Sequence, residues 1–318
     1  MARRRGVWPI PVPALWRGRR RSWRRRPKAM RRIAHISDLH FGRVDPDAVI
    51  ALGQELIAQA PDLVVVSGDL TQRARSRQFL DARAFLDSLK LPILVVPGNH
   101  DVPWHNPVQR FLGPHGRFRK MIGKDLSPVL RDPEMTVAGI TTSRALVPHW
   151  NWANGRISTK RARRVATLLA AEPAEKLRVV VTHHPLAFAP SPTGGASPDG
   201  TLPTFNAAGA LRALGAARVD LMLSGHMHVS RAACLSFPGP KPDGTPWTAV
   251  VVQAASAIST RLRGEPNAYN MIETSANGLD VHIRAWTVGA QDFATVATRH
   301  FARIDGVWAA SQPLTGQS

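Results

Sequence analysis

The chain contains a single cysteine, Cys234, among its 318 residues. One thiol cannot form an intrachain disulfide, so a small disulfide-stapled fold is excluded, and the sequence favours a reducing compartment. We therefore expect a cytoplasmic protein. The sequence also lacks any run of 18 consecutive apolar residues. Because a membrane-spanning helix needs such a run, we expect no transmembrane segment.

Acidic residues are scarce: 22 Asp and Glu stand against 42 Lys and Arg, which gives a formal net charge of +20. Residues 1–29 contain no acid and carry ten Arg together with Lys28. Several prolines interrupt the apolar part of this segment, so it does not fit a secretory signal peptide. We interpret residues 1–29 as a disordered basic extension or as the product of a mis-assigned start, with Met30 as the natural beginning. Any contact with nucleic acid or an anionic membrane is expected through this segment alone.

Residues 30–308 are expected to form one domain of the α/β class. Nearly continuous apolar runs, which predict strands covered on both faces, occur at 32–37, 63–67, 93–96, 136–140, 178–182 and 219–224. Helical length and spacing occur at 47–60, 76–90, 158–171 and 206–217. Three later runs predict antiparallel strands at 249–253, 268–273 and 279–285. This order indicates a layered sandwich, and residues 309–318 are expected to be a disordered tail.

Two long segments without regular patterning interrupt this order, residues 102–133 and 186–204. Long loops in a compact domain commonly serve function, so both segments are candidates for contact with a substrate. His115 lies in the first of them and is expected at the surface. His35 lies inside the first predicted strand and is expected to be a packed structural residue.

Residue types that bind metals follow the ends of five predicted strands. They are Asp38 and His40, then Asp69, then Asn99-His100-Asp101, then His183-His184, and finally His226 and His228. Ligands of α/β sheets bind beyond the carboxyl ends of the strands, so we expect these side chains to converge at one edge. Residues two apart in an extended segment point to the same face, so each D-x-H or H-x-H pair is expected to bind neighbouring ions. The glycines that precede these ligands are expected to allow tight turns.

The donor set consists of imidazoles, carboxylates and one carboxamide, which suits divalent Mn, Fe or Zn better than calcium. Seven such ligands are too many for a single zinc ion, whereas two ions that share a carboxylate account for the number. Paired ions generate a bound hydroxide and clamp a phosphoryl group. The pattern therefore predicts a centre of two divalent metal ions that hydrolyses a phosphate ester.

The ordered motifs Asp38-x-His40, Gly68-Asp69, Gly98-Asn99-His100-Asp101, His183-x-Pro185 and Gly225-His226-x-His228 resemble those of the calcineurin-like metallophosphoesterase family. The resemblance covers roughly residues 31–285. The His183-His184-Pro185 form and the run Gly68-Asp69-Leu70-Thr71 further resemble bacterial class III cyclic-nucleotide phosphodiesterases. The resemblance to this family implies a four-layer α-β-β-α sandwich with a dinuclear metal site at the carboxyl ends of the strands.

The resemblance also implies how the ligands divide between the ions. One ion would be held by Asp38, His40, Asp69 and His228. The other would be held by Asp69, Asn99, His183 and His226, so that Asp69 bridges. The chain alone does not decide between His183 and His184, but the His-x-Pro form of the motif favours His183.

Three groups of residues are expected around the substrate. The resemblance implies that His100 would stabilise the phosphoryl group or donate a proton on the side of the leaving group, with Asp101 holding its ring. Arg73 and Arg75 follow Asp69 closely and either bind a further phosphate or cover a helix face. Trp104 either stacks on a nucleobase or anchors its loop.

The expected function is hydrolysis of a phosphodiester, a cyclic nucleotide or another small organic diester, by attack of a metal-bridging hydroxide. A pyrophosphohydrolase of a nucleotide-linked lipid precursor is one alternative. Nucleic-acid binding or nuclease action through residues 1–29 is another. The partner is thus expected to be a small phosphate ester, while the actual substrate, the physiological metal and the oligomeric state are left open.

Overall fold

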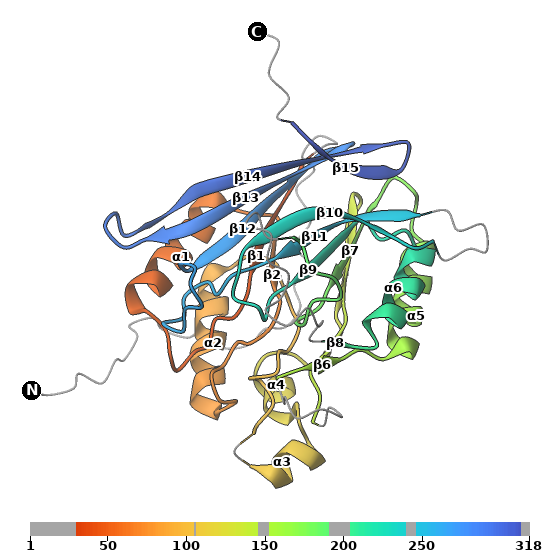
Figure 1. The fold of residues 1–318 in the computed structure, drawn as a ribbon. Coiled ribbons are helices and arrows are strands. Elements are labelled where there is room, and N and C mark those ends of the chain that lie inside the picture. Colours follow the sequence, from red (N-terminus) through yellow and green to blue (C-terminus); the bar gives the residue numbers. More distant parts are fainter. Residues whose placement is uncertain (1–29, 105, 146–152, 191–203, 240–245, 313–318) are drawn as a thin grey trace, which may run out of the picture.

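The structure is a computed structural model that describes residues 30–104, 106–145, 153–190, 204–239 and 246–312. Two β-sheets lie against each other at its centre (Figure 1). The first sheet has the order β15 (Val307–Ser311), β14 (Asp292–Ile304), β13 (Gly278–Thr287), β12 (Ala268–Thr274), β1 (Arg31–Ile36), β2 (Leu63–Val66) and β3 (Ile93–Val95). The second has the order β10 (Arg231–Phe237), β11 (Trp247–Gln253), β9 (Leu221–Ser224), β7 (Leu177–Val181), β5 (Met135–Gly139) and β4 (Val129–Arg131). A short parallel pair joins β6 (Gly155–Arg156) to β8 (Thr204–Phe205).

Parallel strands lie at one end of the first sheet and in the centre of the second. In the first sheet β1, β2 and β3 run parallel, with Ile33 opposite Leu63 and Val64 opposite Ile93. In the second sheet β5, β7, β9 and β11 run parallel, and its edge strands β4 and β10 pair antiparallel. In the first sheet β12, β13, β14 and β15 pair antiparallel. The loops that carry candidate ligands therefore leave the carboxyl ends of parallel strands in both sheets.

Helices cover the outer face of each sheet, as Figure 1 shows for α1 (Pro46–Gln59) and α2 (Ser76–Leu89) on one side and α5 (Thr159–Ala170) and α6 (Ala207–Ala216) on the other. One apolar cluster joins α1 and α2 to the first sheet, and another joins α5 and α6 to the second. A third cluster fills the space between the sheets with side chains such as Val65, Val179 and Leu221. These three cores confirm the predicted four-layer α-β-β-α sandwich.

The four long helices begin and end within one residue of their predicted bounds. Local chemistry explains the start of α1: the side chain of Asp45 accepts hydrogen bonds from the backbone N–H groups of Asp47 and Ala48, and Pro46 takes the first helical position. Ser158 and Asn206 occupy the N-cap positions of α5 and α6 without such a side-chain bond. In the described part of the chain, no helix is long and apolar enough to cross a membrane.

Several segments depart from the prediction. Residues 102–133 are not irregular throughout, because they contain α3 (Pro107–Leu112), α4 (Gly116–Met121) and β4. Helices of six residues are too short to show a reliable apolar period. The tail predicted at 309–318 is ordered at its start, since β15 continues to Ser311 by pairing with β14. Residues 1–29, 191–203 and 313–318 lie outside the described part of the chain.

The predictions for His35 and His115, which rested on their positions in the sequence alone, have opposite outcomes. His35 is fully buried and its Nε2 lies 2.9 Å from the hydroxyl of Ser67, so its structural role is confirmed. His115 is also buried, which makes the predicted surface position wrong. Its Nε2 lies 2.9 Å from the hydroxyl of Ser143, because α4 folds back against the segment that follows β5.

Burial, together with the charges of Arg119, Arg144 and Arg161 nearby, lowers the pKa of His115 to about 4. The pKa of an exposed histidine is about 6.5. Between these pH values the unfolded chain binds a proton that the folded chain does not, so the free energy of unfolding must fall as the pH falls. Over this pH range the free energy of unfolding of His115→Gln should therefore fall by up to about 3 kcal/mol less than that of the wild-type protein. Urea unfolding of both proteins in chelator, at pH 7 and pH 4.5, measures the difference, and equal pH dependence would contradict it.

Candidate metal centre

The predicted ligands do meet at one edge of the sandwich. Asp38 and His40 follow β1, Asp69 follows β2 and Asn99 follows β3, all in the first sheet. From the second sheet, His183 follows β7, and His226 and His228 follow β9. Both sheets present the carboxyl ends of their parallel strands to this edge, which brings the seven side chains together from positions 190 residues apart in sequence.

The backbone at the ligands differs from the extended form assumed for the D-x-H and H-x-H pairs. Five ligands have positive φ angles: Asp38 (52°), His40 (51°), Asp69 (51°), His226 (70°) and His228 (59°). Residues other than glycine rarely adopt this left-handed conformation, which costs about 1 kcal/mol or more each and is concentrated at functional sites. The side chains converge because the chain turns sharply after each strand, and the extended-segment interpretation is wrong.

Two of the glycines before ligands are needed for space rather than for a turn. A Cβ atom at Gly98 would lie 2.1 Å from Oδ1 of Asp69. A Cβ atom at Gly225 would lie 1.9 Å from the hydroxyl of Ser37 and 2.5 Å from Oδ2 of Asp38. Neither glycine has a positive φ, whereas Gly68 has a φ of 104° and fits the predicted turn. The loops that carry Asp38 and Asp69 therefore pack directly against Gly225 and Gly98, and any residue with a Cβ atom at either position would clash with them.

A first group of donors consists of Asp38, His40 and His228, which are all buried. The Nε2 atoms of His40 and His228 are 3.2 Å apart, and Nε2 of His228 is 3.2 Å from Oδ1 of Asp38. The other carboxylate oxygen of Asp38 accepts hydrogen bonds from Ser37 and from the backbone N–H of His226, which fixes its orientation. Oδ1 of Asp38 is left without a hydrogen-bond partner although it is buried.

Asp69 lies between this group and a second one. Its Oδ1 accepts a hydrogen bond from the backbone N–H of His100 at 2.8 Å. Its Oδ2 is 3.8 Å from Nε2 of His40 and 3.4 Å from Nε2 of His183. Oδ1 of Asn99 completes the second group, at 3.0 Å from Nε2 of His183 and 3.1 Å from Nδ1 of His226. One carboxylate oxygen thus faces donors of both groups, as a bridging ligand would.

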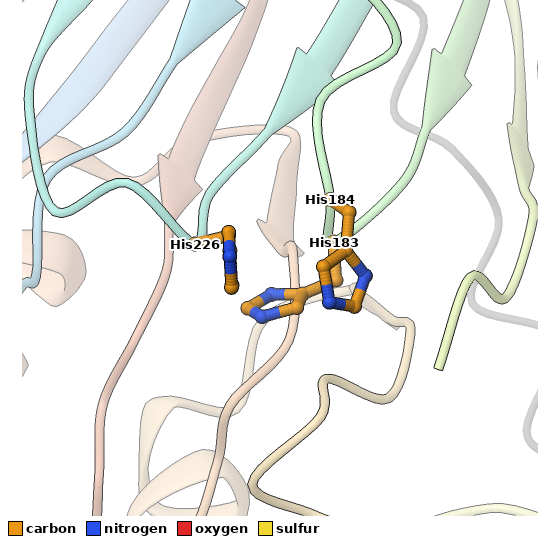
Figure 2. Close-up of side chains that lie close together, drawn as sticks. All are labelled: His183, His184 and His226. Carbon is orange, nitrogen blue, oxygen red and sulfur yellow. The ribbon is translucent and has the colours of Figure 1, made fainter. Parts of the chain in front are cut away.

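Figure 2 shows His183, His184 and His226 with their rings close together. The rings of His183 and His184 differ in whether a nitrogen faces the other candidate ligands. His183 uses Nδ1 to contact the carbonyl of Ser67 at 2.8 Å and turns Nε2 toward Asn99 and Asp69. His184 engages both nitrogens elsewhere, with Nδ1 at 2.7 Å from the hydroxyl of Thr142 and Nε2 at 2.8 Å from the carbonyl of Ala153. This arrangement favours His183 as the ligand.

The buried carboxyls and imidazoles of the site shift one another's pKa values. Burial opposes ionisation of Asp38 and Asp69, yet adjacent histidines, His228 for Asp38 and His183 for Asp69, hold the pKa of both carboxyls below the usual range. Burial also opposes a charge on His183, but Asp69 and Asp38 outweigh it and raise its pKa to about 9. By contrast, burial lowers the pKa of His226 to about 3. Both carboxyls are thus held ionised in a buried site, where bound cations would balance their negative charge.

These residues fit a pair of divalent cations. His183 and His228 each contact a backbone carbonyl through Nδ1, which is the usual way to orient a metal-binding imidazole and to leave Nε2 for the metal. The unpartnered Oδ1 of Asp38 points into the same space. Nitrogen and oxygen donors of this kind suit Mn, Fe or Zn.

The residues expected beside the leaving group are arranged differently from the prediction. The Nδ1 of His100 lies 2.9 Å from the carbonyl of Gln72, and its Nε2 lies 3.1 Å from the guanidinium of Arg261. Asp101 does not hold this ring: its carboxylate accepts hydrogen bonds from the backbone of Gly98, Leu70 and Thr71 and from the Thr71 hydroxyl. Asp101 is therefore a positioning residue for the two loops that carry Asp69 and Asn99.

Arg261 was missed by sequence reasoning. Besides its contact with His100, it offers its backbone carbonyl to Nδ1 of His228 at 3.1 Å. The residue follows β11, which was predicted, but no ligand-type motif marks this loop. A basic residue close behind a predicted strand end was the available signal.

The three candidate substrate contacts are exposed, and Arg73 directly follows Gln72, whose carbonyl contacts His100. The guanidinium of Arg73 lies over the ring of Trp104 at 5.9 Å from the ring centre. Trp104 is 51% exposed. Arg75 is exposed at the N-cap of α2. The roles of these residues toward a substrate stay predictions.

Comparison with protein families and curated proteins supports the chemistry of this site. A family model described as calcineurin-like phosphoesterase matches residues 31–230. The chain is 40% identical over 80 residues to the glycerophosphodiester phosphodiesterase GpdQ of Enterobacter lignolyticus, which covers 22% of this chain and 29% of that protein. It is 33% identical over 117 residues to a probable cyclic nucleotide phosphodiesterase of Synechococcus sp., which covers 34% of this chain and 40% of that protein.

A third relative is the UDP-2,3-diacylglucosamine pyrophosphatase LpxG of Chlamydia muridarum, 36% identical over 73 residues that cover 22% of each chain. The matches thus span less than half the length of each of these relatives. Among solved structures, PhoD superposes with a TM-score of 0.65 at 10% identity, over 91% of this chain and 73% of that chain. A dimetal phosphatase from Danio rerio superposes with a TM-score of 0.55 at 14% identity, over 84% and 98%. At such identities the two structures establish the fold alone.

Proposed function

Because this chain belongs to the calcineurin-like phosphoesterase family and is a hydrolase of phosphate esters, we propose that it hydrolyses a small phosphodiester at a centre of two divalent metal ions. One observation carries the proposal. Donor atoms of seven side chains from both sheets face one another at 3.0–3.8 Å, and among them lies a buried carboxylate oxygen of Asp38 without a hydrogen-bond partner. A buried polar arrangement of this kind is costly unless cations complete it.

Each ion would draw on donors from both sheets. Asp38, His40 and His228 would hold one, Asn99, His183 and His226 the other, and Asp69 would join them through the oxygen that faces both groups. Bound there, two divalent ions activate water and neutralise the oxygens of a phosphoryl group. Ser67, Arg261 and Ser37 orient the ligands, because they fix the hydrogen bonds of His183, His228 and Asp38.

His100 and Arg261 form the polar wall next to these ligands. The ring of His100 lies edge-on to that of His40, with 4.8 Å between ring centres. Since Nδ1 of His100 faces a carbonyl, it carries the proton, and Nε2 accepts from Arg261. We expect Arg261, held by Nε2 of His100, to balance negative charge on the phosphoryl oxygens as the alkoxide leaves. In this arrangement His100 positions the guanidinium and has no proton at Nε2 to donate.

A diester is favoured over a monoester by the named relatives. GpdQ is a glycerophosphodiester phosphodiesterase, and the Synechococcus protein is a probable cyclic nucleotide phosphodiesterase. The exposed Arg73 and Trp104 offer a cation and an aromatic face to the organic part of such a substrate. The relative LpxG acts on a pyrophosphate, and this keeps a nucleotide-linked pyrophosphate as the second candidate.

The test is a substrate comparison with purified protein loaded with manganese, iron or zinc. Bis(p-nitrophenyl) phosphate, glycerophosphodiesters, cyclic nucleotides, nucleotide-linked pyrophosphates and p-nitrophenyl phosphate are assayed in parallel. We expect the highest kcat/KM for a diester, at least about tenfold above that for the monoester, with loss of activity in chelator and recovery on return of the metal. Activity that survives complete removal of metal would refute the two-ion centre, and preference for the monoester or the pyrophosphate would refute the diester assignment.

A further inference from the structure

A cavity of about 360 Å³ lies beside the metal centre, and none of its lining residues is a candidate ligand. It opens between α4, the segment after β5 and the first turn of α5. Its lining residues are Pro114, His115, Arg119, Leu126, Arg144 and Arg161, together with Ala145. The volume falls in the range of small-molecule pockets, which is about 300–1,000 Å³.

The cavity gathers positive charge without an acidic counterpart. Arg119, Arg144 and Arg161 come from three separate segments and line the same space. Within the part of the chain that the structure describes, the ion pairs formed by acidic side chains go to other cations and to none of these three. Burial lowers the pKa of the Arg144 guanidinium, and repulsion from Arg161 and Arg156 acts in the same direction. Like charges held this close favour an anion between them.

Hydrogen bonds tie the cavity wall to the metal centre. The Nε2 of His115 lies 2.9 Å from the hydroxyl of Ser143. The preceding residue, Thr142, places its hydroxyl 2.7 Å from Nδ1 of His184, and the ring of His184 lies 4.7 Å from that of His183. A single short segment after β5 therefore forms one wall of the cavity and one wall of the metal centre.

We propose that this arginine-lined cavity binds a phosphate group, either the second phosphate of a bis-phosphorylated substrate or free inorganic phosphate. Guanidinium groups donate paired, charge-assisted hydrogen bonds to phosphate oxygens, and three of them offer more donors than a single phosphate can use. The neutral ring of His115 adds a polar group at the same wall. The first source rests on the proposed function, whereas the second does not.

Binding is measured at His115 itself, by NMR of its ring C–H signals in zinc-loaded protein during a titration with inorganic phosphate. A variant, His115→Gln, assigns the signals. A phosphate in the cavity opposes the three arginines, so the titration should shift the His115 signals and raise the pKa of that ring. In Arg144→Gln and in Arg161→Gln the phosphate concentration at half-saturation should rise at least tenfold. Arg163→Gln is the matched control, because this arginine is exposed on α5 and does not line the cavity.

Unaltered His115 signals, or the same half-saturation in both arginine variants as in wild type, would overturn the proposal. Circular dichroism and melting of each variant show that it is folded, and the two single variants are independent of each other. The signal comes from the cavity, so it is expected even if the chain hydrolyses none of the diesters tested. Failure of the proposed function and failure of this site are thereby distinguished.

Kinetics separates the two sources of phosphate. Thymidine 5′-(p-nitrophenyl phosphate) and its 3′-phosphate differ by one phosphate group only. If the cavity takes the second phosphate of a substrate, wild type should prefer the 3′-phosphorylated compound at least tenfold in kcat/KM, and this ratio should fall toward one in Arg144→Gln. If it takes free phosphate, the ratio is close to one in both proteins while the NMR response persists. Either ratio agrees with a phosphate site, so the kinetic comparison identifies the source of the phosphate, whereas the NMR titrations of wild type and of the arginine variants decide whether the site exists.

Discussion

Asp69→Asn should lower turnover of a phosphodiester by about 10³-fold or more and weaken the binding of both ions. The amide oxygen of the new side chain can keep the hydrogen bond from the backbone N–H of His100. Its NH₂ group would replace the oxygen that lies 3.4 Å from His183 and 3.8 Å from His40. An amide N–H does not coordinate a cation, so the link between the two groups of donors is lost with almost no change of shape.

Metal content after equilibration with manganese, together with kcat for bis(p-nitrophenyl) phosphate, measures this effect. The metal-free variant should unfold at a lower urea concentration than metal-free wild type, because His183 loses the carboxylate that stabilises its charge, and circular dichroism shows whether it is still folded under the assay conditions. Asp87→Asn is the control, since Asp87 is an exposed aspartate that pairs with Arg83. Near-normal activity of Asp69→Asn with two bound ions would contradict the bridging role.

Replacing the neighbouring histidines His183 and His184 should give two different losses. His183→Ala removes the Nε2 atom that faces Asn99 and Asp69, so the protein should hold about one ion fewer and lose about 10²-fold or more in turnover. His184→Ala removes a fully buried ring and its contacts with Thr142 and Ala153. It should keep both ions and lose about 2–4 kcal/mol of unfolding free energy.

Elemental analysis of the purified variants and urea unfolding in chelator separate these outcomes. The two variants serve as controls for each other, because they delete the same ring from adjacent positions. A His184→Ala protein with wild-type stability and a missing ion would reverse the assignment of the ligand. The comparison therefore decides a question that the motif alone left open.

The sequence was sufficient to predict that the candidate ligands meet at one edge, because each one follows a strand whose apolar run is unmistakable. Val64, Val65 and Val66 mark β2, and Gly68-Asp69 come directly after it. The shared edge then follows from the rule for α/β sheets. Contacts between loops did not follow: Thr142 and Ala153 hold His184, and Gly98, Leu70 and Thr71 hold Asp101. Such pairings depend on how separate loops pack, which leaves no periodic trace in the chain.

Outer strands were harder to predict than central ones. Apart from Phe293 and Phe301, β14 consists of exposed and partly buried residues without regular alternation, and the residues of β15, the strand that follows it, are mostly exposed. Ala294, Thr295 and Thr298 give this strand little apolar contrast. β10 is half-buried along most of its length. These strands form by pairing with neighbours already in place, so the register of β13 and β11 determines them more than their own composition does.

The donors of the metal centre are divided between the two sheets, with Asp38, His40, Asp69 and Asn99 on one and His183, His226 and His228 on the other. If these residues bind two ions as proposed, each sheet would contribute an incomplete shell to both. Cations bound there would cross-link the two sheets at this edge of the sandwich. The free energy of ion binding would then add directly to the stability of the packing between the two sheets. Loss of the ions should therefore first separate the two sheets at this edge, while the hydrogen bonds between the strands of each sheet remain intact.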